Sequence, residues 1–159
     1  MTTKTDIISA PISEFVPHSD PMILIDRILD FSDHSLTAEI HIHNDSRFFN
    51  HDLNGVEAWV SIEYMAQAIA ALAGAKAKLN NEPVKLGFLL GTRKFLSHQP
   101  VLTPDNTYLI EVKELFMDES GLGAFQCVLK DPALKNDDTI ICEAKLNVFE
   151  TNDTNQLLN

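Results

Sequence analysis

The sequence contains few cysteines and no long hydrophobic run. Its two cysteines, Cys127 and Cys142, lie in separate strand-like segments without a CxxC spacing, so we expect two inert core thiols rather than a zinc site or a disulfide framework. No apolar stretch approaches the ~20 residues that a membrane helix requires, and residues 1–9 lack the basic and apolar parts of a signal peptide. We therefore expect a cytoplasmic protein that does not enter a membrane.

Basic residues are scarce as well. The chain has 12 Lys and Arg against 23 Asp and Glu, which gives a formal net charge of −11. Because phosphate backbones bind basic stripes, this excess of acid argues against a nucleic-acid partner. A hydrophobic fraction of 45% with 22% charged residues is typical of a soluble globular protein.

The chain has the length of one ordinary domain. Its 159 residues contain no internal repeat and no low-complexity linker. Polar, unpatterned residues occupy both ends, so we expect residues 1–11 and 151–159 to be tails around a single domain of residues 12–150.

Hydrophobic periodicity predicts one long helix among strands. Apolar residues recur at helical spacing from Gly55 to about Leu79, on nearly every side, so this helix should be buried over most of its surface. Asn54 and Glu57 have the spacing of a capping-box pair at its start. The segment from Leu36 to His43 alternates like a half-buried strand, and residues 22–28 suit a buried strand or a short apolar turn.

The rest of the chain reads as strands separated by turn-forming residues, including the turn 136–138. The order of one early strand, one long apolar helix and then a series of strands predicts an α+β domain whose antiparallel sheet curls round the helix. The later strands are expected at Leu86–Leu90, Arg93–Leu96, Thr107–Phe116, Ala124–Lys130 and Thr139–Phe149.

Three ordered blocks carry a family resemblance. Residues 15–28 read FVPHSDPMILIDRI, residues 48–51 and 62–68 read FFNH and IEYMAQA, and residues 88–95 and 100–105 read FLLGTRKF and PVLTPD. Together they resemble the hot-dog-fold β-hydroxyacyl-acyl carrier protein dehydratases. Within that superfamily, their sequence is most similar to the divergent subunits linked to aryl-polyene and polyketide gene clusters. The resemblance implies a hot-dog fold, with an antiparallel sheet wrapped round one long central helix.

The resemblance also implies the catalytic residues of a 3-hydroxyacyl dehydratase. His51 falls at the family's catalytic histidine, whose neutral imidazole can accept the C2 proton, and Glu63 falls at its carboxylate, the acid for the departing hydroxyl. Burial of Glu63 in an apolar helix would favour its protonated form. The backbone N–H groups of Ala58 and Trp59, at the start of the helix, are candidates for binding the developing oxyanion.

Two departures from the family pattern concern the loop after His51. The chain has Asp52, Leu53 and Asn54 where the family has Phe-Pro-Gly, and His51 and Glu63 stand twelve positions apart, which is shorter than the common spacing. The Pro-Gly that precedes the family's helix is missing. These changes keep a non-catalytic role in a heterodimer open as an alternative.

The implied partners are an acyl carrier protein with its phosphopantetheine-linked substrate and a second subunit, either an identical chain or another dehydratase. In the family, the histidine and the carboxylate of one site come from different subunits. Arg93, Lys94 and Arg47 are the basic residues placed by the sequence to meet the substrate phosphate or the carrier protein. Because carrier proteins are acidic, docking on this acidic chain requires a local basic patch.

Plainer interpretations exist for several residues. A hot-dog thioesterase would use a carboxylate and water on the same thioester, although retention of both His51 and Glu63 favours dehydration. Gln67 can simply bind backbone groups, and Trp59 is of a type more often found in a core. His41 and His43 have a spacing that metal ligands can use, but a solvated strand face explains them better, and we expect no metal and no cofactor.

Overall fold

The computed structural model describes residues 1–18, 20–135 and 139–151. The predicted turn at residues 136–138 and the end of the predicted tail, residues 152–159, lie outside them. In chain order the elements are α1 (Lys4–Ser9), η1 (Ile12–Glu14), β1 (Arg27–Phe31), β2 (Ser35–Ile42), β3 (Phe49–Asn50), β4 (Gly55–Glu57), η2 (Ala58–Val60), α2 (Ser61–Leu79), β5 (Leu86–Ser97), β6 (Val101–Leu102), β7 (Asn106–Met117), β8 (Leu122–Lys130) and β9 (Ile140–Thr151).

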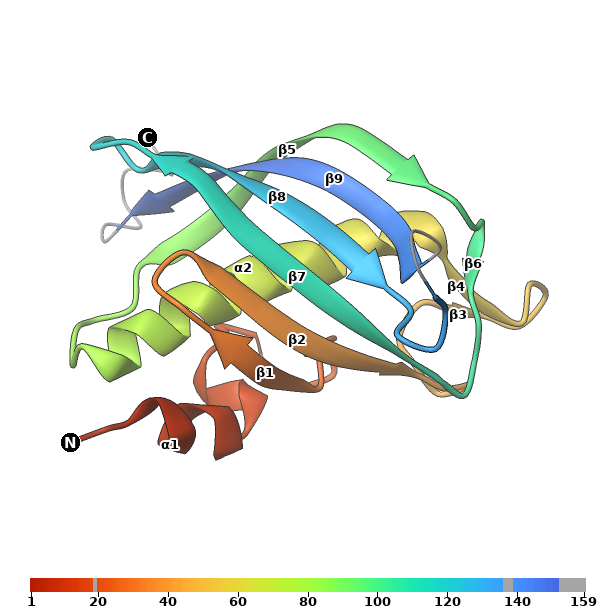
Figure 1. Cartoon of the computed structure of the whole chain (residues 1–159), viewed down its shortest axis with the longest axis horizontal. Helices are drawn as coiled ribbons and strands as arrows, with labels where there is room; N and C mark the ends of the chain where they lie inside the picture. Colours follow the sequence, from red (N-terminus) through yellow and green to blue (C-terminus); the bar gives the residue numbers. More distant parts are fainter. Residues whose placement is uncertain (19, 136–138, 152–159) are drawn as a thin grey trace.

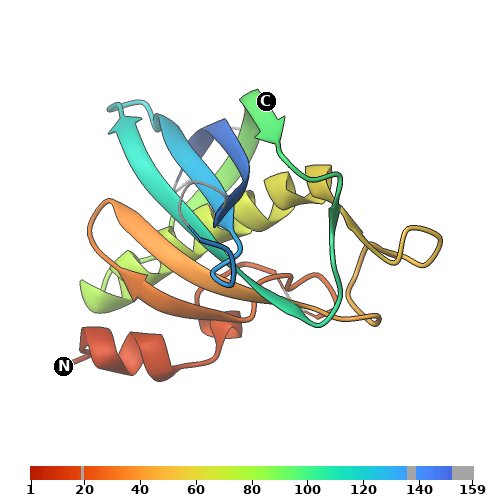
Figure 2. The same ribbon diagram turned by 45° about the vertical axis from the view of Figure 1, so that its right-hand side comes forward.

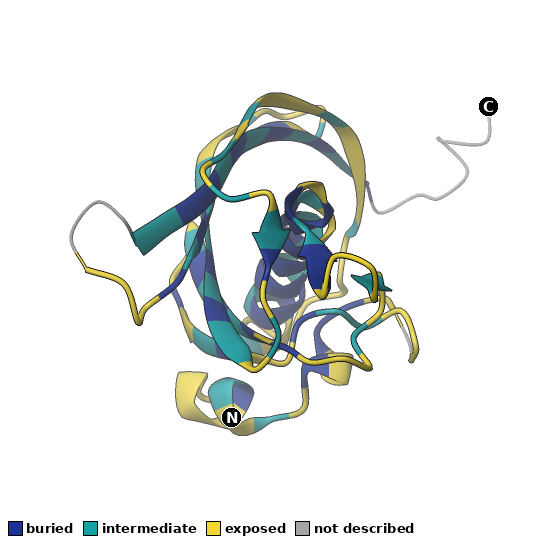
Figure 3. Cartoon of the chain, turned by 90° about the vertical axis from the view of Figure 1, so that its right-hand side faces the viewer, coloured by how far each residue is buried: buried dark blue, intermediate teal, exposed yellow. Residues whose placement is uncertain are grey.

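One six-stranded antiparallel sheet wraps round α2. Its strand order is β1-β2-β7-β8-β9-β5, and the strands curve past the helix in Figure 1. The end-on view in Figure 3 shows buried residues along α2 and along the strands that surround it. Alternate residues of β2, β7 and β9 are buried, as period-two strands with one covered face require. The α+β hot-dog architecture predicted from the sequence is therefore confirmed.

The long helix begins later than predicted. Residues 55–57 form β4, η2 follows, and the N-cap of α2 is Val60, without a side-chain hydrogen bond, so the predicted capping box of Asn54 and Glu57 is wrong. The reason is tertiary, because Val56 of β4 pairs with both Phe49 and Leu102. A Cβ on Gly55 would lie 2.3 Å from the Leu102 carbonyl oxygen, so this close pairing requires glycine.

The first residues of the chain are folded, which corrects the predicted tail of residues 1–11. Thr3 and Asp6 form a reciprocal capping box that starts α1, and this signature was present in the sequence. Ile7 is 1% exposed and belongs to the core. The folded unit therefore reaches back to α1.

Two contacts hold the segment between η1 and β1 against α2. Gln67 is buried, its Oε1 accepts hydrogen bonds from the N–H groups of Leu24 (2.6 Å) and Ile25 (3.0 Å), and its Nε2 donates to the Met22 carbonyl (2.9 Å). The interpretation that Gln67 binds backbone is thus confirmed. At Gly74 a Cβ would lie 2.1 Å from the carbonyl oxygen of Phe15, so glycine allows the segment to touch the helix backbone.

Strand β5 is an edge of the sheet. It is one strand with irregularities near Gly91 and Lys94, where the sequence predicted two strands, and within the described residues it pairs only with β9. Several of its apolar side chains are exposed: Phe88, Leu89, Leu90 and Leu96.

The two cysteines are free and buried, as predicted. Burial raises the pKa of the Cys127 thiol to about 12, which makes it unreactive at neutral pH. Within the described residues, no helix is long and apolar enough to cross a membrane.

Candidate functional site

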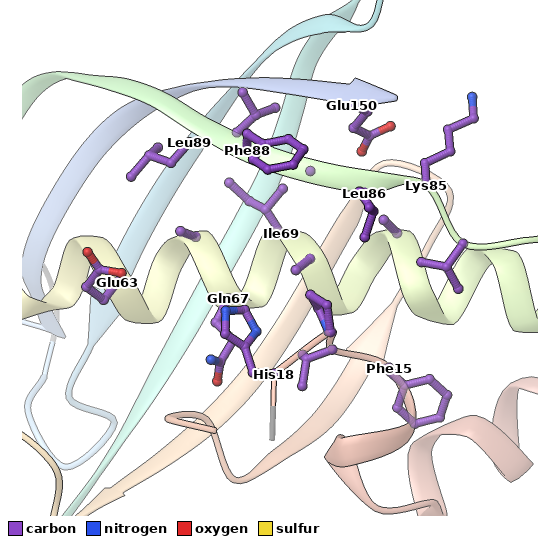
Figure 4. Close-up of a pocket in the computed structure, with 18 of the residues that line it drawn as sticks. Phe15, His18, Glu63, Gln67, Ile69, Lys85, Leu86, Phe88, Leu89 and Glu150 are labelled. Carbon is purple, nitrogen blue, oxygen red and sulfur yellow. The ribbon is translucent and has the colours of Figure 1, made fainter. Parts of the chain in front are cut away.

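An elongated cavity of about 440 Å³ runs along α2. The helix contributes a stripe of mostly small residues, β5 forms one wall, and the segment between η1 and β1 forms another. Figure 4 shows Glu63 at one end of the cavity, with Lys85 and Glu150 at the other. From Glu63 to Ala73 the helix advances ten residues, or about 15 Å at 1.5 Å per residue. The principal apolar lining residues are Ala66, Ile69, Ala70, Ala73, Phe88 and Leu89.

Glu63 places a carboxylate at the end of the cavity near the start of α2. It lies in the first turn of the helix and is exposed, so the burial expected from the apolar sequence around it is absent in the single chain. The first turn tolerates an acid because the helix dipole favours negative charge there. The geometry allows a ligand in the cavity to reach this carboxylate.

The far end of the cavity is polar, which the sequence analysis missed. The carboxyl group of Glu150 forms no hydrogen bond or salt bridge with another described residue. Burial raises its pKa, while Lys85 and Lys76 oppose the shift and Glu114 adds to it. Glu150 continues the inward-facing alternation of β9 through Leu146 and Val148. This alternation predicts that the side chain at position 150 faces inward, but we had placed the end of the domain at that residue.

His51 lies on a different part of the molecule. It follows β3, is exposed, and its ring meets the Phe49 ring edge-on at a centroid distance of 5.0 Å. It is not among the residues that line the cavity. Figure 2 shows the β3–β4 loop projecting from one end of the molecule. A single chain therefore does not bring His51 and Glu63 into one cavity.

The short loop after His51 is held by side chains from both of its ends. The Asn50 Oδ1 accepts hydrogen bonds from the N–H groups of Asp52 (3.0 Å) and Leu53 (3.1 Å), and the Asn50 Nδ2 donates to Glu57 (3.3 Å). Glu57 also accepts a hydrogen bond from the indole N–H of Trp59. These bonds fix a loop that lacks the Pro-Gly of the family pattern.

The two backbone N–H groups predicted to bind the oxyanion differ in whether they are already hydrogen-bonded. The Ala58 N–H donates to the Pro100 carbonyl at 2.9 Å, so this group is already engaged and the prediction is wrong for Ala58. The Trp59 N–H stays a candidate. Its side chain is 56% exposed, which corrects the interpretation of Trp59 as a core residue.

The predicted basic contacts come from different elements. The Arg47 guanidinium lies over the Phe48 ring, 5.4 Å from its centroid, whereas Arg93 and Lys94 are exposed on β5. His41 is exposed on β2, and no group of three or more potential ligands for a metal ion occurs within the part of the chain that the structure describes.

Comparison with known proteins places this arrangement in a family. The model of the ApeP-like family, described as ApeP dehydratase, matches residues 10–159. The 3-hydroxyacyl-[acyl-carrier-protein] dehydratase FabZ of Yersinia enterocolitica is 30% identical over 151 residues, which cover 92% of this chain and 85% of that protein.

Comparison with solved structures supports the same family. The dehydratase heterocomplex ApeI:P from Xenorhabdus doucetiae superposes with a TM-score of 0.81 at 29% identity, covering 94% of this chain and 98% of that one. A hypothetical thioesterase from Streptococcus pneumoniae, with a TM-score of 0.60 at 12% identity over 78% of this chain and 84% of that one, shares the fold alone. The chain therefore belongs to the ApeP-like dehydratases, hot-dog homologues of FabZ.

Proposed function

We propose that this chain is one subunit of a dehydratase that converts 3-hydroxyacyl chains on an acyl carrier protein into trans-2-enoyl thioesters, in fatty-acid or polyene synthesis. The observation that carries the proposal is the carboxylate of Glu63 at one end of a long, largely apolar cavity. An acyl chain lying along α2 would have its polar, reacting end at this carboxylate.

The proposed chemistry uses two side chains. A histidine takes the proton from C2 of the thioester, the electrons form the C2–C3 double bond, and the C3–O bond breaks as a carboxylic acid protonates the leaving hydroxyl to give water. We assign the first role to His51 and the second to Glu63, each in a different site of the assembled pair and each completed by a group of the second subunit. A positioned acid or base typically contributes ~10²–10⁴ in rate. The backbone N–H of Trp59 is the proposed donor to the thioester oxygen, whose negative charge grows as the proton leaves.

A second subunit completes the proposed site. His51 is exposed and lies outside the cavity that holds Glu63, so another chain has to supply the missing group. The unpaired edge and exposed apolar side chains of β5 offer a surface for such a subunit. The likeness to the ApeI:P heterocomplex favours a different dehydratase chain over an identical one as the partner.

The test compares the chain alone, a second dehydratase subunit alone and the two co-expressed, each incubated with 3-hydroxyacyl carrier protein. Loss of one water, followed by mass spectrometry, is expected for the assembled pair. In that pair His51→Ala should abolish dehydration at the site that contains His51, and His51→Ala combined with Glu63→Gln should abolish it altogether. The fold and the assembly should persist, because removing an exposed loop side chain costs little stability.

The remaining outcomes separate the alternatives. Release of the acyl group would indicate a thioesterase. Undiminished dehydration by a pair that contains both His51→Ala and Glu63→Gln in this chain would assign it the role of a non-catalytic subunit, which the altered loop after His51 keeps open, and would refute the proposed mechanism.

A further inference from the structure

A second cavity lies beyond the polar end of the first. It has a volume of about 330 Å³, takes walls from β7 and β8, and continues along α2 as far as the C-cap residue Asn80. The two cavities share four lining residues, which are Ile69, Ala73, Lys85 and Glu150. In Figure 4, Glu150 points from the end of β9 toward the helix. We call the first cavity the front cavity, the second the back cavity, and the four shared residues the boundary.

The front cavity holds a limited length of acyl chain between Glu63 and the boundary. Ile69 and Ala73 follow Glu63 by six and ten residues on α2, which is about 9 and 15 Å along the helix. A carbon–carbon bond of about 1.5 Å advances an extended chain by about 1.25 Å, so roughly seven to twelve carbon atoms fit beyond the reacting centre. A longer chain has to pass Glu150 to reach the back cavity.

The back cavity offers apolar walls to a longer chain. Its apolar lining residues include Leu72, Ala77, Met117 and Phe125. Leu72 and Phe125 belong to the hydrophobic core. Burying one more methylene group against such walls strengthens binding about fourfold. The apolar walls alone would therefore favour chains that enter the back cavity.

Glu150 opposes this entry, because its carboxyl group has no bonding partner among the described residues. Lys76 and Lys85 lie near enough to lower its pKa, but neither forms a salt bridge with it, whereas Glu114 in the back cavity is paired with His34 at 2.7 Å. A carboxylate without a partner depends on water for its solvation, and burial already raises the pKa of this group. A methylene chain that passes Glu150 displaces this water and offers no hydrogen bond in return.

We propose that Glu150 is a specificity-determining residue that sets the length of the acyl chain. The chain of a preferred substrate ends in front of Glu150, and longer chains are rejected at the boundary. This inference rests on the proposed function and deepens it, because it assigns the substrate class as 3-hydroxyacyl thioesters with roughly seven to twelve carbon atoms beyond C3.

The experiment follows dehydration of a homologous series of 3-hydroxyacyl pantetheines that lengthens by one methylene at a time. The assembled pair carries His51→Ala, so that turnover reports the site that contains Glu63 and the front cavity. In this background the parent protein is compared with Glu150→Ala, which removes the carboxyl group, and with Glu150→Gln, which removes the charge and keeps the size. Glu82→Ala is the matched control, because Glu82 is an exposed acid that lines the back cavity but not the front one.

The expected result is a shift in the preferred chain length. In the parent protein kcat/KM should rise about fourfold per methylene up to the boundary and fall for longer chains. The rise should continue into longer chains in Glu150→Ala and extend less far in Glu150→Gln, while Glu82→Ala should keep the parent optimum. An unchanged optimum in Glu150→Ala would overturn the proposal, as would an equal loss at every length, which would indicate a structural role. If Glu150→Ala does not fold, an unchanged optimum in Glu150→Gln overturns it.

Failure of the proposed function gives a different result, because then no chain length loses water. In that case, isothermal titration calorimetry with saturated acyl pantetheines measures the preferred length without catalysis. Tightest binding at a greater length in Glu150→Ala than in the parent protein and in Glu82→Ala supports the role of Glu150. The same length profile in all three proteins overturns it.

Discussion

Replacing Gln67 with leucine should destabilise the protein, because the backbone groups that Gln67 binds lose their hydrogen-bond partner. The change leaves the buried Ile25 N–H and the part-buried Leu24 N–H without their acceptor, while the carbonyl group of Met22, an exposed residue, can accept a hydrogen bond from water. An unsatisfied buried donor costs about 1–3 kcal/mol, so we expect a loss of about 2–4 kcal/mol in the free energy of unfolding. For a chain of this size the loss corresponds to a fall in Tm of about 6–12 °C.

Equilibrium urea unfolding, followed by circular dichroism at several protein concentrations, measures this loss separately from changes in association. Gln126→Leu is the matched control, because Gln126 is exposed on β8 and its replacement should cost less than about 0.5 kcal/mol. Since Met22 and Leu24 line the cavity, Gln67→Leu should also raise KM more than it lowers kcat. A loss of stability no larger than that of the control would refute the reasoning.

Three further predictions concern the site. Glu63→Gln keeps the size and hydrogen-bonding capacity of the side chain but cannot deliver a proton. In a pair whose other site is disabled by His51→Ala, it should lower the single-turnover rate constant by about 10²-fold, and a rise in KM alone would contradict the role. Asn50→Ala removes the acceptor for two N–H groups of the His51 loop and should lower kcat about tenfold with little change in Tm; Asn50→Asp, which keeps the acceptor oxygen, should restore most of it. Burial raises the pKa of Glu150 in the folded state above its ordinary value of 4.5. The protonated carboxyl group therefore stabilises the fold fully below pH 4.5, and this stabilisation is lost as the pH rises through the raised pKa. Glu150→Gln should therefore gain Tm relative to wild type as the pH rises from 4 toward about 7, and parallel Tm curves would contradict this sign.

The strands that could be predicted from the sequence are those with one covered face. Residues 36–43 alternate because β2 has α2 on one side and solvent on the other, and the same pattern marks β9. The start of α2 could not be predicted in this way. Gly55 to Glu57 lie in a strand because they pair with β3 and β6, and β6 is more than forty residues away in the chain.

The candidate site could also be predicted only in part from the sequence. Motif resemblance named His51 and Glu63, but only the folded structure separates them into an exposed loop and a cavity. Lys85 and Glu150 were missed, the first because it lies in an unpatterned connection. The placing of Lys113 and Lys145 on either side of Gln126 depends on strand register, which no local pattern in the sequence encodes.

The position of β5 in the sheet affects the order in which the chain can fold during synthesis. β5 follows α2 directly, but the strand that pairs with it, β9, is made last among the described strands. Until residues 140–151 have emerged, an apolar segment of twelve residues, Leu86–Ser97, has no hydrogen-bonding neighbour on either side. Nascent chains are therefore most exposed to aggregation, and most dependent on chaperones, over the interval between the synthesis of β5 and that of β9.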